Sequence, residues 1–218
     1  MYLSHQLSGL LVADLTALPA ISLVTPPAAA LDFSPPGTMG PHSAVQMLDR
    51  DVLVVTEEVY PSPYGTGCPW GKLRTVDISD PTAPALLGEF GLPENDPATC
   101  GLSPPSAYER ITFTAHNATV MHDLALVTWY AGGLQALDLQ DPANPRQLAE
   151  LRPEPIPSVT TEDPALGGNG VEMWSYPVIQ DGLIYVVDVR NGLYILRYRG
   201  LWQEQVTGVG FLEGNSNL

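Results

Sequence analysis

Short apolar runs separated by turn residues recur along the chain, and one strand-like pattern is repeated four times. The copies begin about 60 residues apart, at Gly9, Lys72, Gly133 and Gly192. Aliphatic and β-branched runs of this length, bounded by Asp, Gly and Pro, are typical of β-strands rather than helices. A repeat at a fixed period also indicates that one supersecondary unit is used several times. The chain is therefore predicted to be all-β and built from tandem units.

A sharp turn and a further strand follow the two middle copies. Ser79–Pro84 and Gln140–Pro145 share the pattern Asp-Pro-x-x-Pro, in which proline fixes φ and donates no hydrogen bond. The apolar runs Ala85–Phe90 and Arg146–Leu151 come next. Each of these units therefore contains a hairpin of two strands.

A second hairpin precedes this one in each unit. Its copies span Ser43–Thr56, Asn117–Trp129 and Tyr176–Val187, with Asp or Gly at the turn. Two hairpins in succession predict a four-stranded antiparallel blade, and tandem blades predict a β-propeller. A β-sandwich of short strands is the alternative fold, but it does not require the same four-strand order to recur.

The repeat divides residues 1–200 into blades at about 1–30, 38–92, 111–152 and 171–200, followed by a C-terminal tail at 201–218. Leu3–Gln6 aligns with Val127–Tyr130, so the first blade begins partway through. About three and a half blades are present, whereas closed propellers have about four to eight. We expect a larger propeller with blades upstream of Met1, because an open strand edge favours aggregation. Closure by pairing with another chain is the alternative.

The two middle units resemble the LVIVD-repeat family. The pattern that carries the resemblance is Gly-Leu-x-x-x-Asp-Leu/Ile-x-Asp-Pro-x-x-Pro, preceded by Pro-His-Ser at 41–43 or Ala-His-Asn at 115–117. The resemblance runs from Leu3 to about Arg199 and implies a β-propeller of a bacterial, exported protein. The last unit departs from the pattern, because Arg197 stands where Asp is expected and Gly200–Trp202 replaces the turn. Terminal repeats are often atypical.

The charge of the chain restricts its partners. Acidic residues outnumber basic ones 24 to 9, for a formal net charge of −15. Nucleic acid and anionic membrane surfaces both need a basic protein face, so neither is expected as a partner. The apolar stretch Leu7–Val24 is interrupted by Asp14 and Pro19 and lacks the features of a membrane span or a signal peptide. We therefore expect no membrane insertion and an export signal upstream of Met1.

The two cysteines indicate the compartment. Cys68 and Cys100 lie in the Pro/Gly/Ser-rich segments Tyr60–Trp70 and Pro93–Pro105. Their positions on either side of one half-blade predict a disulfide, and hence an oxidising, extracellular or cell-surface location. Two free thiols in a cytosolic protein are the alternative.

Two histidines suggest a metal site. His42 and His116 occupy the same position in successive units, at the start of the first strand of a blade. In a propeller this strand lines the central channel, so the imidazoles are expected to approach each other. Glu57, Glu58 and Glu172 are nearby in the repeat, and the predicted set for a divalent transition metal is His42, His116 and Glu172. The alternative is that each histidine orders its own strand.

Four aromatic residues are candidates for contact with a ligand or partner. They are Trp129, Tyr130, Trp174 and Tyr176, and Trp174 takes the place of the repeated histidine in the fourth unit. Such side chains would suit a carbohydrate or protein partner, whereas packing between blades is the alternative.

Three repeated aspartates are better explained by structure than by chemistry. Asp14, Asp77 and Asp138 lie one to a blade, so they are predicted to bond their own turns rather than to act together as acids or Ca²⁺ ligands. The sequence also lacks nucleophile-elbow, phosphate-loop and His-Glu-x-x-His motifs.

The function predicted from these features is an extracellular β-propeller binding or scaffold module without a catalytic site. The rival hypothesis is a metal-dependent oxidoreductase or hydrolase that uses the channel-facing His42 and His116. The two hypotheses differ in what they predict for metal binding. Removal of either histidine should abolish bound metal in the metal-dependent enzyme and should not affect the binding module in this way.

Overall fold

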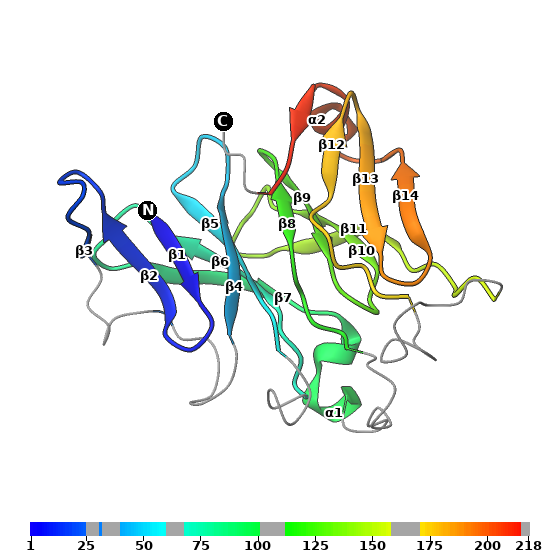
Figure 1. Cartoon of the computed structure of the whole chain (residues 1–218), viewed down its shortest axis with the longest axis horizontal. Coiled ribbons are helices and arrows are strands. Elements are labelled where there is room, and N and C mark those ends of the chain that lie inside the picture. Colours follow the sequence, from blue (N-terminus) through cyan, green and yellow to red (C-terminus); the bar gives the residue numbers. More distant parts are fainter. Residues whose placement is uncertain (25–30, 32–39, 60–67, 101–111, 158–170, 215–218) are drawn as a thin grey trace.

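The structure is a computed structural model that describes residues 1–24, 31, 40–59, 68–100, 112–157 and 171–214. Nearly all of its regular elements are strands, and they form four antiparallel sheets that follow one another along the chain (Figure 1). We call these sheets 1 to 4 in chain order. Neighbouring sheets pack face against face, so apolar clusters join sheet 1 to sheet 2, sheet 2 to sheet 3 and sheet 3 to sheet 4.

Sheet 1 has three strands and the others have four. Sheet 1 contains β1 (Tyr2–His5), β2 (Gly9–Asp14) and β3 (Ser22–Leu23). Sheet 2 contains β4 (Pro41–Gln46), β5 (Val52–Glu57), β6 (Leu73–Asp77) and β7 (Ala85–Phe90). Sheet 3 contains β8 (Ala118–Val120), β9 (Leu124–Thr128), β10 (Leu134–Asp138) and β11 (Arg146–Leu151). Sheet 4 contains β12 (Val178–Gln180), β13 (Leu183–Asp188), β14 (Gly192–Leu196) and β15 (Phe211–Leu212).

Sheet 4 is assembled differently from the two sheets before it. Strands β4 to β7 and β8 to β11 lie side by side in chain order, whereas sheet 4 has the order β14-β13-β12-β15. Helix α2 (Gln203–Thr207) leads the chain back to the β12 edge, where β15 pairs. Residues 201–214 lie in the segment predicted as a tail. They form helix α2 and strand β15, and β15 is the edge strand of sheet 4.

The all-β class and the four-stranded antiparallel sheets predicted from the repeat are confirmed. The arrangement is propeller-like, and the number of blades stays a prediction. Two short helical segments interrupt the strands after β7, namely a 3₁₀ turn at Pro93–Asn95 and helix α1 (Pro97–Cys100). No helix in the described residues is long and apolar enough to cross a membrane.

The repeated aspartates bond their own turns, as predicted. Asp14, Asp77 and Asp138 each accept a hydrogen bond from the backbone amide two residues later, at 2.8, 2.9 and 3.0 Å. This contact bends the chain after the third strand of each unit. The same bond in three separate sheets explains why Asp recurs there.

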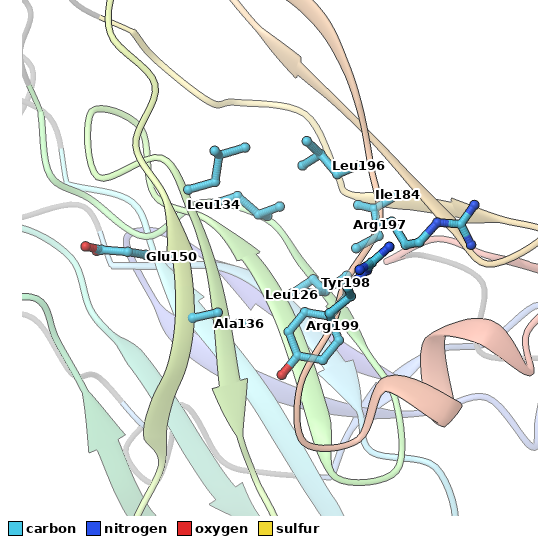
Figure 2. A pocket seen from close by; sticks show the side chains of 11 residues that line it. Leu126, Leu134, Ala136, Glu150, Ile184, Leu196, Arg197, Tyr198 and Arg199 are labelled. Atoms are coloured by element: carbon cyan, nitrogen blue, oxygen red, sulfur yellow. The ribbon is translucent and has the colours of Figure 1, made fainter.

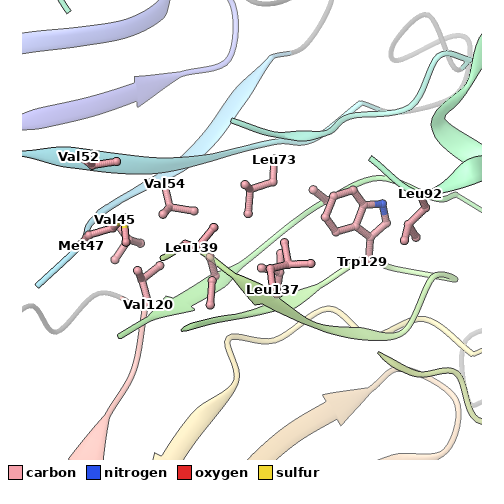
Figure 3. Packing of buried hydrophobic residues seen from close by; sticks show 14 residues of the cluster. Val45, Met47, Val52, Val54, Leu73, Leu92, Val120, Trp129, Leu137 and Leu139 are labelled. Atoms are coloured by element: carbon pink, nitrogen blue, oxygen red, sulfur yellow. The ribbon is translucent and has the colours of Figure 1, made fainter. Parts of the chain in front are cut away.

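The core consists of one apolar cluster between each pair of neighbouring sheets. Figure 3 shows the cluster between sheets 2 and 3, where Val54 and Leu73 face Leu137 and Trp129. Alternate residues of β9 and β10 enter the clusters on opposite sides of sheet 3. A strand covered on both faces is built mainly from apolar residues, which accounts for the many apolar positions in these strands.

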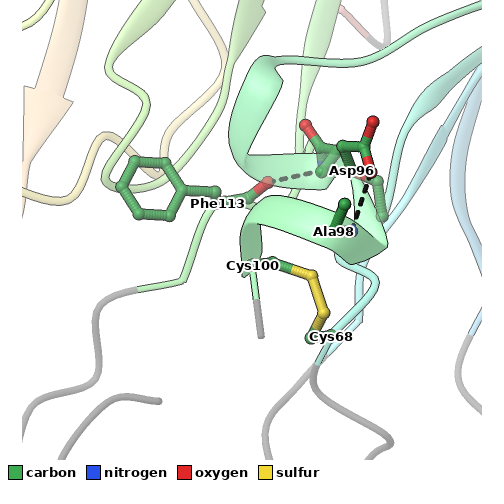
Figure 4. The surroundings of a disulfide bond; sticks show 7 residues. Cys68, Asp96, Ala98, Cys100 and Phe113 are labelled. Carbon is green, nitrogen blue, oxygen red and sulfur yellow. Dashed lines mark hydrogen bonds between the residues drawn. A yellow bond between two sulfur atoms is a disulfide. The ribbon is translucent and has the colours of Figure 1, made fainter. Parts of the chain in front are cut away.

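Cys68 and Cys100 form the predicted disulfide, with their Cα atoms 5.8 Å apart. The bond joins the segment before β6 to helix α1 (Figure 4). Asn95, just before that helix, donates to the backbone carbonyls of Gly71 and Phe113 at 2.9 Å each. The disulfide and this amide therefore fasten the same short helical region to the base of sheet 2 and to the chain that enters sheet 3.

A cavity of about 290 Å³ lies between sheets 3 and 4. Leu134 and Ala136 line it from sheet 3, and Ile184 and Leu196 line it from sheet 4 (Figure 2). In sheets 2 and 3 an outer strand flanks the third strand, whereas β14 forms the edge of sheet 4. The cavity thus lies beside the position where sheet 4 lacks an outer strand.

Candidate metal centre

A β-bulge directs His42 away from the regular alternation of β4. Pro41 pairs with Glu57 and Ser43 pairs with Thr56, so His42 between them is the extra residue of the bulge. Bulges redirect a side chain and are frequent beside functional sites. The His42 side chain is partly buried, with 27% of its surface exposed.

His116 reaches the same region from the segment before β8. Its backbone amide donates to Thr128 at 2.9 Å, and its carbonyl accepts from the Ser43 hydroxyl at 3.3 Å and from the Thr56 hydroxyl. These bonds hold the His116 backbone between sheets 2 and 3. The two imidazole rings therefore lie close together, with centroids 4.3 Å apart.

Glu58, directly after β5, completes a cluster with the two histidines. Its Oε1 lies 3.1 Å from Nε2 of His116, and its Oε2 lies 3.6 Å from Nε2 of His42. One ligand atom from each of the three side chains lies within 4.8 Å of the others. We call His42, Glu58 and His116 the His–Glu cluster. Two imidazoles and a carboxylate are a ligand set that transition metals accept.

The repeat explains why these side chains converge. His42, His116 and Trp174 share one repeat position, while Gln6, Glu58 and Tyr130 share another. Glu58 accepts a hydrogen bond from Gln6 Nε2 at 3.1 Å and another from the Tyr130 hydroxyl. Equivalent positions of sheets 1, 2 and 3 thus meet at one carboxylate.

The two ring nitrogens of His116 face different partners, since Nδ1 faces the chain before sheet 4 and Nε2 faces Glu58. Its Nδ1 lies 2.6 Å from the carbonyl oxygen of Trp174. Asn117 Nδ2 lies 2.8 Å from the same Nδ1 and donates to the same carbonyl at 2.9 Å. Metal-binding histidines commonly donate their second ring N–H to a backbone carbonyl in this way.

Nε2 of His116 faces the Glu58 carboxylate, 3.1 Å from its Oε1. A carboxylate oxygen and an imidazole nitrogen at this separation can both bind one cation, either a proton or a metal ion. Burial and the neighbouring His116 lower the pKa of His42, although Glu58 opposes the shift. The lowered pKa favours the neutral imidazole of His42, which is the form that binds metals.

The other predicted carboxylates lie outside the cluster. Glu57 turns to Arg74, 3.4 Å away, and burial raises its pKa against the opposing charge of Arg74. Glu172 is buried in the segment before sheet 4, where its backbone carbonyl accepts from Val189 at 3.0 Å. The structure brings together both predicted histidines, and it places Glu58 rather than Glu172 beside them.

The four aromatic candidates occupy different environments, and Tyr176 is partly buried just before β12. Trp129 is fully buried and donates its ring N–H to the Phe113 carbonyl at 2.8 Å. Tyr130 is buried at the cluster, and its ring lies edge-on to His116 with centroids 5.0 Å apart. Trp174 is 53% exposed and stacks on His116 with centroids 6.1 Å apart. The exposed Trp174 and the buried Tyr130 therefore flank the same histidine.

The sequence analysis did not select Gln6, Asn117 or the carboxylate of Glu58 for the site. The signal for Glu58 was the alignment of Gln6, Glu58 and Tyr130 at one repeat position. Polar residues at a position that is otherwise part of a packed sheet indicate a shared polar contact between sheets. The repeat frame alone did not distinguish Glu58 from its neighbour Glu57.

Comparison with known proteins gives one family match. The family model of the LVIVD repeat matches residues 68–91, which include β6, the Asp77 turn and β7. This confirms the resemblance to LVIVD repeats, which are associated with β-propeller folds. No curated protein matches the chain.

Proposed function

We propose that this LVIVD-repeat chain is an exported propeller module that binds one divalent transition metal through His42, Glu58 and His116. The observation that carries the proposal is the convergence of three ligand atoms within 4.8 Å. The second ring nitrogen of His116 is already held by the Trp174 carbonyl at 2.6 Å. That arrangement supports a site in which the protein fixes the orientation of the ligands before the metal binds.

Three protein ligands leave coordination positions for water or a small molecule. Sites with three protein ligands and an open position are typical of catalytic metals, whereas structural zinc sites are closed by four. His42 is the most exposed ligand of the cluster, with 27% of its side chain in contact with solvent against 4% and 5% for Glu58 and His116. The open positions are therefore expected on the side of His42, beside the exposed ring of Trp174.

The disulfide supports an oxidising location. Cys68 and Cys100 are the only cysteines in the chain, and they are bonded to each other. Disulfides persist in secreted and cell-surface proteins and are rare in the cytosol. An exported module with an open metal position would meet its ligand or substrate outside the cell.

The second candidate function is a metal-free binding or scaffold module. The observation that favours it is the pair of hydrogen bonds that Glu58 accepts from Gln6 and Tyr130. These bonds stabilise the carboxylate without a metal, so the cluster also serves to join the sheets. The two candidates make opposite predictions about metal content.

The test is the metal content of tag-free protein loaded with Zn²⁺ or Cu²⁺, desalted and analysed by mass spectrometry. We expect about one metal per chain. His42→Ala and Glu58→Gln should weaken binding by more than about tenfold, because even changes around metal ligands weaken binding about 10–100-fold. His122→Ala is the matched control, since that histidine is exposed and bonds to Asp123 away from the cluster.

Two further measurements separate loss of ligand from loss of fold. The circular dichroism of His42→Ala should match that of the parent, because the substituted side chain lies at a partly exposed bulge. The electron paramagnetic resonance spectrum of the Cu²⁺ form should show two coordinated nitrogens in the parent and one in His42→Ala. A parent chain that binds no metal, or a His42→Ala chain that binds as well as the parent, overturns the proposal in favour of the scaffold.

A further inference from the structure

The turn of one sheet closes the space between sheets 2 and 3. Thr75 of β6 and Gly88 of β7 lie opposite each other in sheet 2. Thr75 donates its hydroxyl to the carbonyl of Pro142, and a Cβ added at Gly88 would lie 2.5 Å from the carbonyl oxygen of Ala143. The Asp-Pro turn of sheet 3 therefore packs directly on the third and outer strands of sheet 2.

The equivalent space between sheets 3 and 4 is the cavity of about 290 Å³. Ala136 and Ala149 pair in sheet 3 at the two positions just described for sheet 2, and both line the cavity. The chain after β14 has no Asp-Pro turn to place there, because Arg197 and Gly200–Trp202 replace that pattern. The cavity therefore coincides with the place where the chain departs from its own repeat.

The walls of the cavity are apolar. Seven of the eleven residues that line it are aliphatic. They come from both sheets, with Leu126 and Leu134 on sheet 3 and Ile184 and Leu196 on sheet 4 (Figure 2). Small-molecule sites are mostly apolar hollows of about 300–1,000 Å³ with a few polar groups. This cavity lies at the lower end of that range and suits the apolar body of a small ligand.

Two arginines border the cavity on its sheet 4 side. Arg197 and Arg199 follow β14, opposite Glu150 on β11 (Figure 2), and both are exposed. The Glu150 carboxylate already lies 3.0 Å from Nε of Arg152. The charge offered to a ligand at this rim therefore comes mainly from the two guanidinium groups.

The pairing of charges sets these two arginines apart. Among the residues that the structure describes, neither has an ion-pair partner. The other six basic side chains there each interact with a carboxylate, namely Arg50, Lys72, Arg74, Arg146, Arg152 and Arg190. A guanidinium group is always charged and can bind a carboxylate through two parallel N–H donors. In a chain with 24 acidic and 9 basic residues, the rim of this cavity is thus a local site for an anion.

We propose that the cavity binds a small molecule that has an apolar body and a single carboxylate. The body occupies the space that the Asp-Pro turn fills between sheets 2 and 3, and the carboxylate meets Arg197 and Arg199. One negative charge is expected rather than two, because Glu150 also borders the cavity and the chain is strongly acidic. The inference goes beyond the metal centre, since no lining residue belongs to the His–Glu cluster.

Isothermal titration calorimetry of the metal-free, 218-residue chain with octanoate provides the test. Octanoate is kept below the concentration at which it forms micelles, and we expect one saturable site per chain. 1-Octanol has the same apolar chain without the charge, and acetate has the charge without the chain. Each should bind at least about tenfold more weakly, because hydrogen bonds to a charged group and apolar burial each contribute a factor of that order.

Three variants separate the two halves of the site. Arg197→Gln/Arg199→Gln should weaken octanoate binding at least about tenfold and leave 1-octanol binding unchanged. Ala136→Leu fills part of the cavity without removing a charge, so it should weaken binding of both molecules without lowering the melting temperature. Lys72→Gln is the matched control; it removes a partly exposed positive charge from sheet 2 and should bind octanoate like the parent.

A parent chain with no saturable octanoate site overturns the proposal, and so does octanoate binding that Ala136→Leu leaves unchanged. Equal affinity for octanoate and 1-octanol also overturns it, because the arginines would then not recognise the carboxylate. The metal-free His42→Ala chain keeps the cavity and should bind octanoate like the parent. The result is therefore independent of whether the His–Glu cluster binds a metal.

Discussion

Sheets 3 and 4 are built from the same repeat, yet they differ in how completely they are buried. Every residue of β9 and β10 is buried. In sheet 4, β13 alternates between buried and more exposed residues, and no residue of β14 is fully buried. The local sequence does not explain this difference in burial, because β13 and β14 are as apolar as β9 and β10. Among the described residues, sheet 3 has a sheet on either side, whereas sheet 4 has one on a single side and β14 lies at its edge.

The comparison shows that position in the array decides what a repeat residue contributes to stability. The repeat supplies the same side chain in both sheets, but only a neighbouring sheet removes it from water. Matched substitutions at equivalent positions of the two sheets therefore separate the effect of the residue from the effect of its surroundings.

The largest expected difference is at the first apolar position of the third strand. Leu134→Ala removes a buried side chain between sheets 3 and 4 and should lower the free energy of unfolding by about 2–5 kcal/mol. Leu193→Ala changes the equivalent residue, which is 58% exposed, and should lower it by less than about 1 kcal/mol. Urea denaturation at low protein concentration measures both. Equal effects would show that this leucine is as well covered in sheet 4 as in sheet 3.

The next difference is at the glycine before that strand. Gly133 and Gly192 have φ angles of +75° and +88°, so alanine at either position should cost about 1–2 kcal/mol in backbone strain. At Gly133 an added Cβ would also lie 2.0 Å from the carbonyl oxygen of Leu151 in the outer strand, whereas nothing lies within 4 Å at Gly192. Gly133→Ala should therefore cost about 1–3 kcal/mol more than Gly192→Ala. Thermal unfolding of the two variants measures the difference, and similar melting temperatures would contradict it.

A smaller difference is expected at the residue that ends the strand. Asp138 accepts hydrogen bonds from the Gln140 amide, from Arg146 at 2.7 Å and from the Trp202 ring N–H at 3.2 Å. Asp138→Ala should lower stability by about 1–3 kcal/mol, because it leaves these donors without their acceptor. Sheet 4 has Arg197 at this position, and Arg197→Ala on the exposed surface should change stability by no more than about 0.5 kcal/mol. Urea midpoints compare the two, and a large effect of Arg197→Ala would be inconsistent with its exposure.

The smallest effect is the pH dependence of the same residue. Burial alone would raise the pKa of Asp138, but the Gln140 amide, Arg146 and Trp202 outweigh it and lower the pKa. A carboxyl group with a lowered folded pKa stabilises the protein above its unfolded pKa, and this stability is lost as the pH falls through the folded value. Acid titration of stability should therefore be shallower in Asp138→Asn than in the parent. An unchanged slope would show that Asp138 has the same pKa in the folded and unfolded chain.

The repeat made much of the fold predictable. The strands, the turn aspartates and the pairing of Cys68 with Cys100 follow from local patterns and from simple counting, and the structure has all three. The C-terminal strand was not predictable, because β15 pairs with β12 through contacts that no local pattern encodes. Strand β15 has only two residues, so its pairing with β12 depends on where the fold places it rather than on its own strand propensity.

The candidate site was predictable in its histidines but not in its carboxylate. His42 and His116 share a repeat position, and this was enough to place them together. The carboxylate predicted for the set was Glu172, which lies in the segment before sheet 4, whereas the cluster contains Glu58. Between the neighbours Glu57 and Glu58, a one-residue change of register decides which side chain faces the histidines. The bulge at His42 shifts the register at that point, so the repeat pattern alone did not identify Glu58.

The hydrogen bonds of Glu58 also bear on how the array unfolds. Arrays of repeats tend to lose their terminal units one at a time, since each unit contacts only its neighbours. Glu58 in sheet 2 is bonded to Gln6 of sheet 1 and to Tyr130 of sheet 3, so separation of either neighbour would leave a buried carboxylate without one of its donors. That penalty opposes fraying from the N-terminal end. The first three sheets should accordingly melt in one cooperative transition.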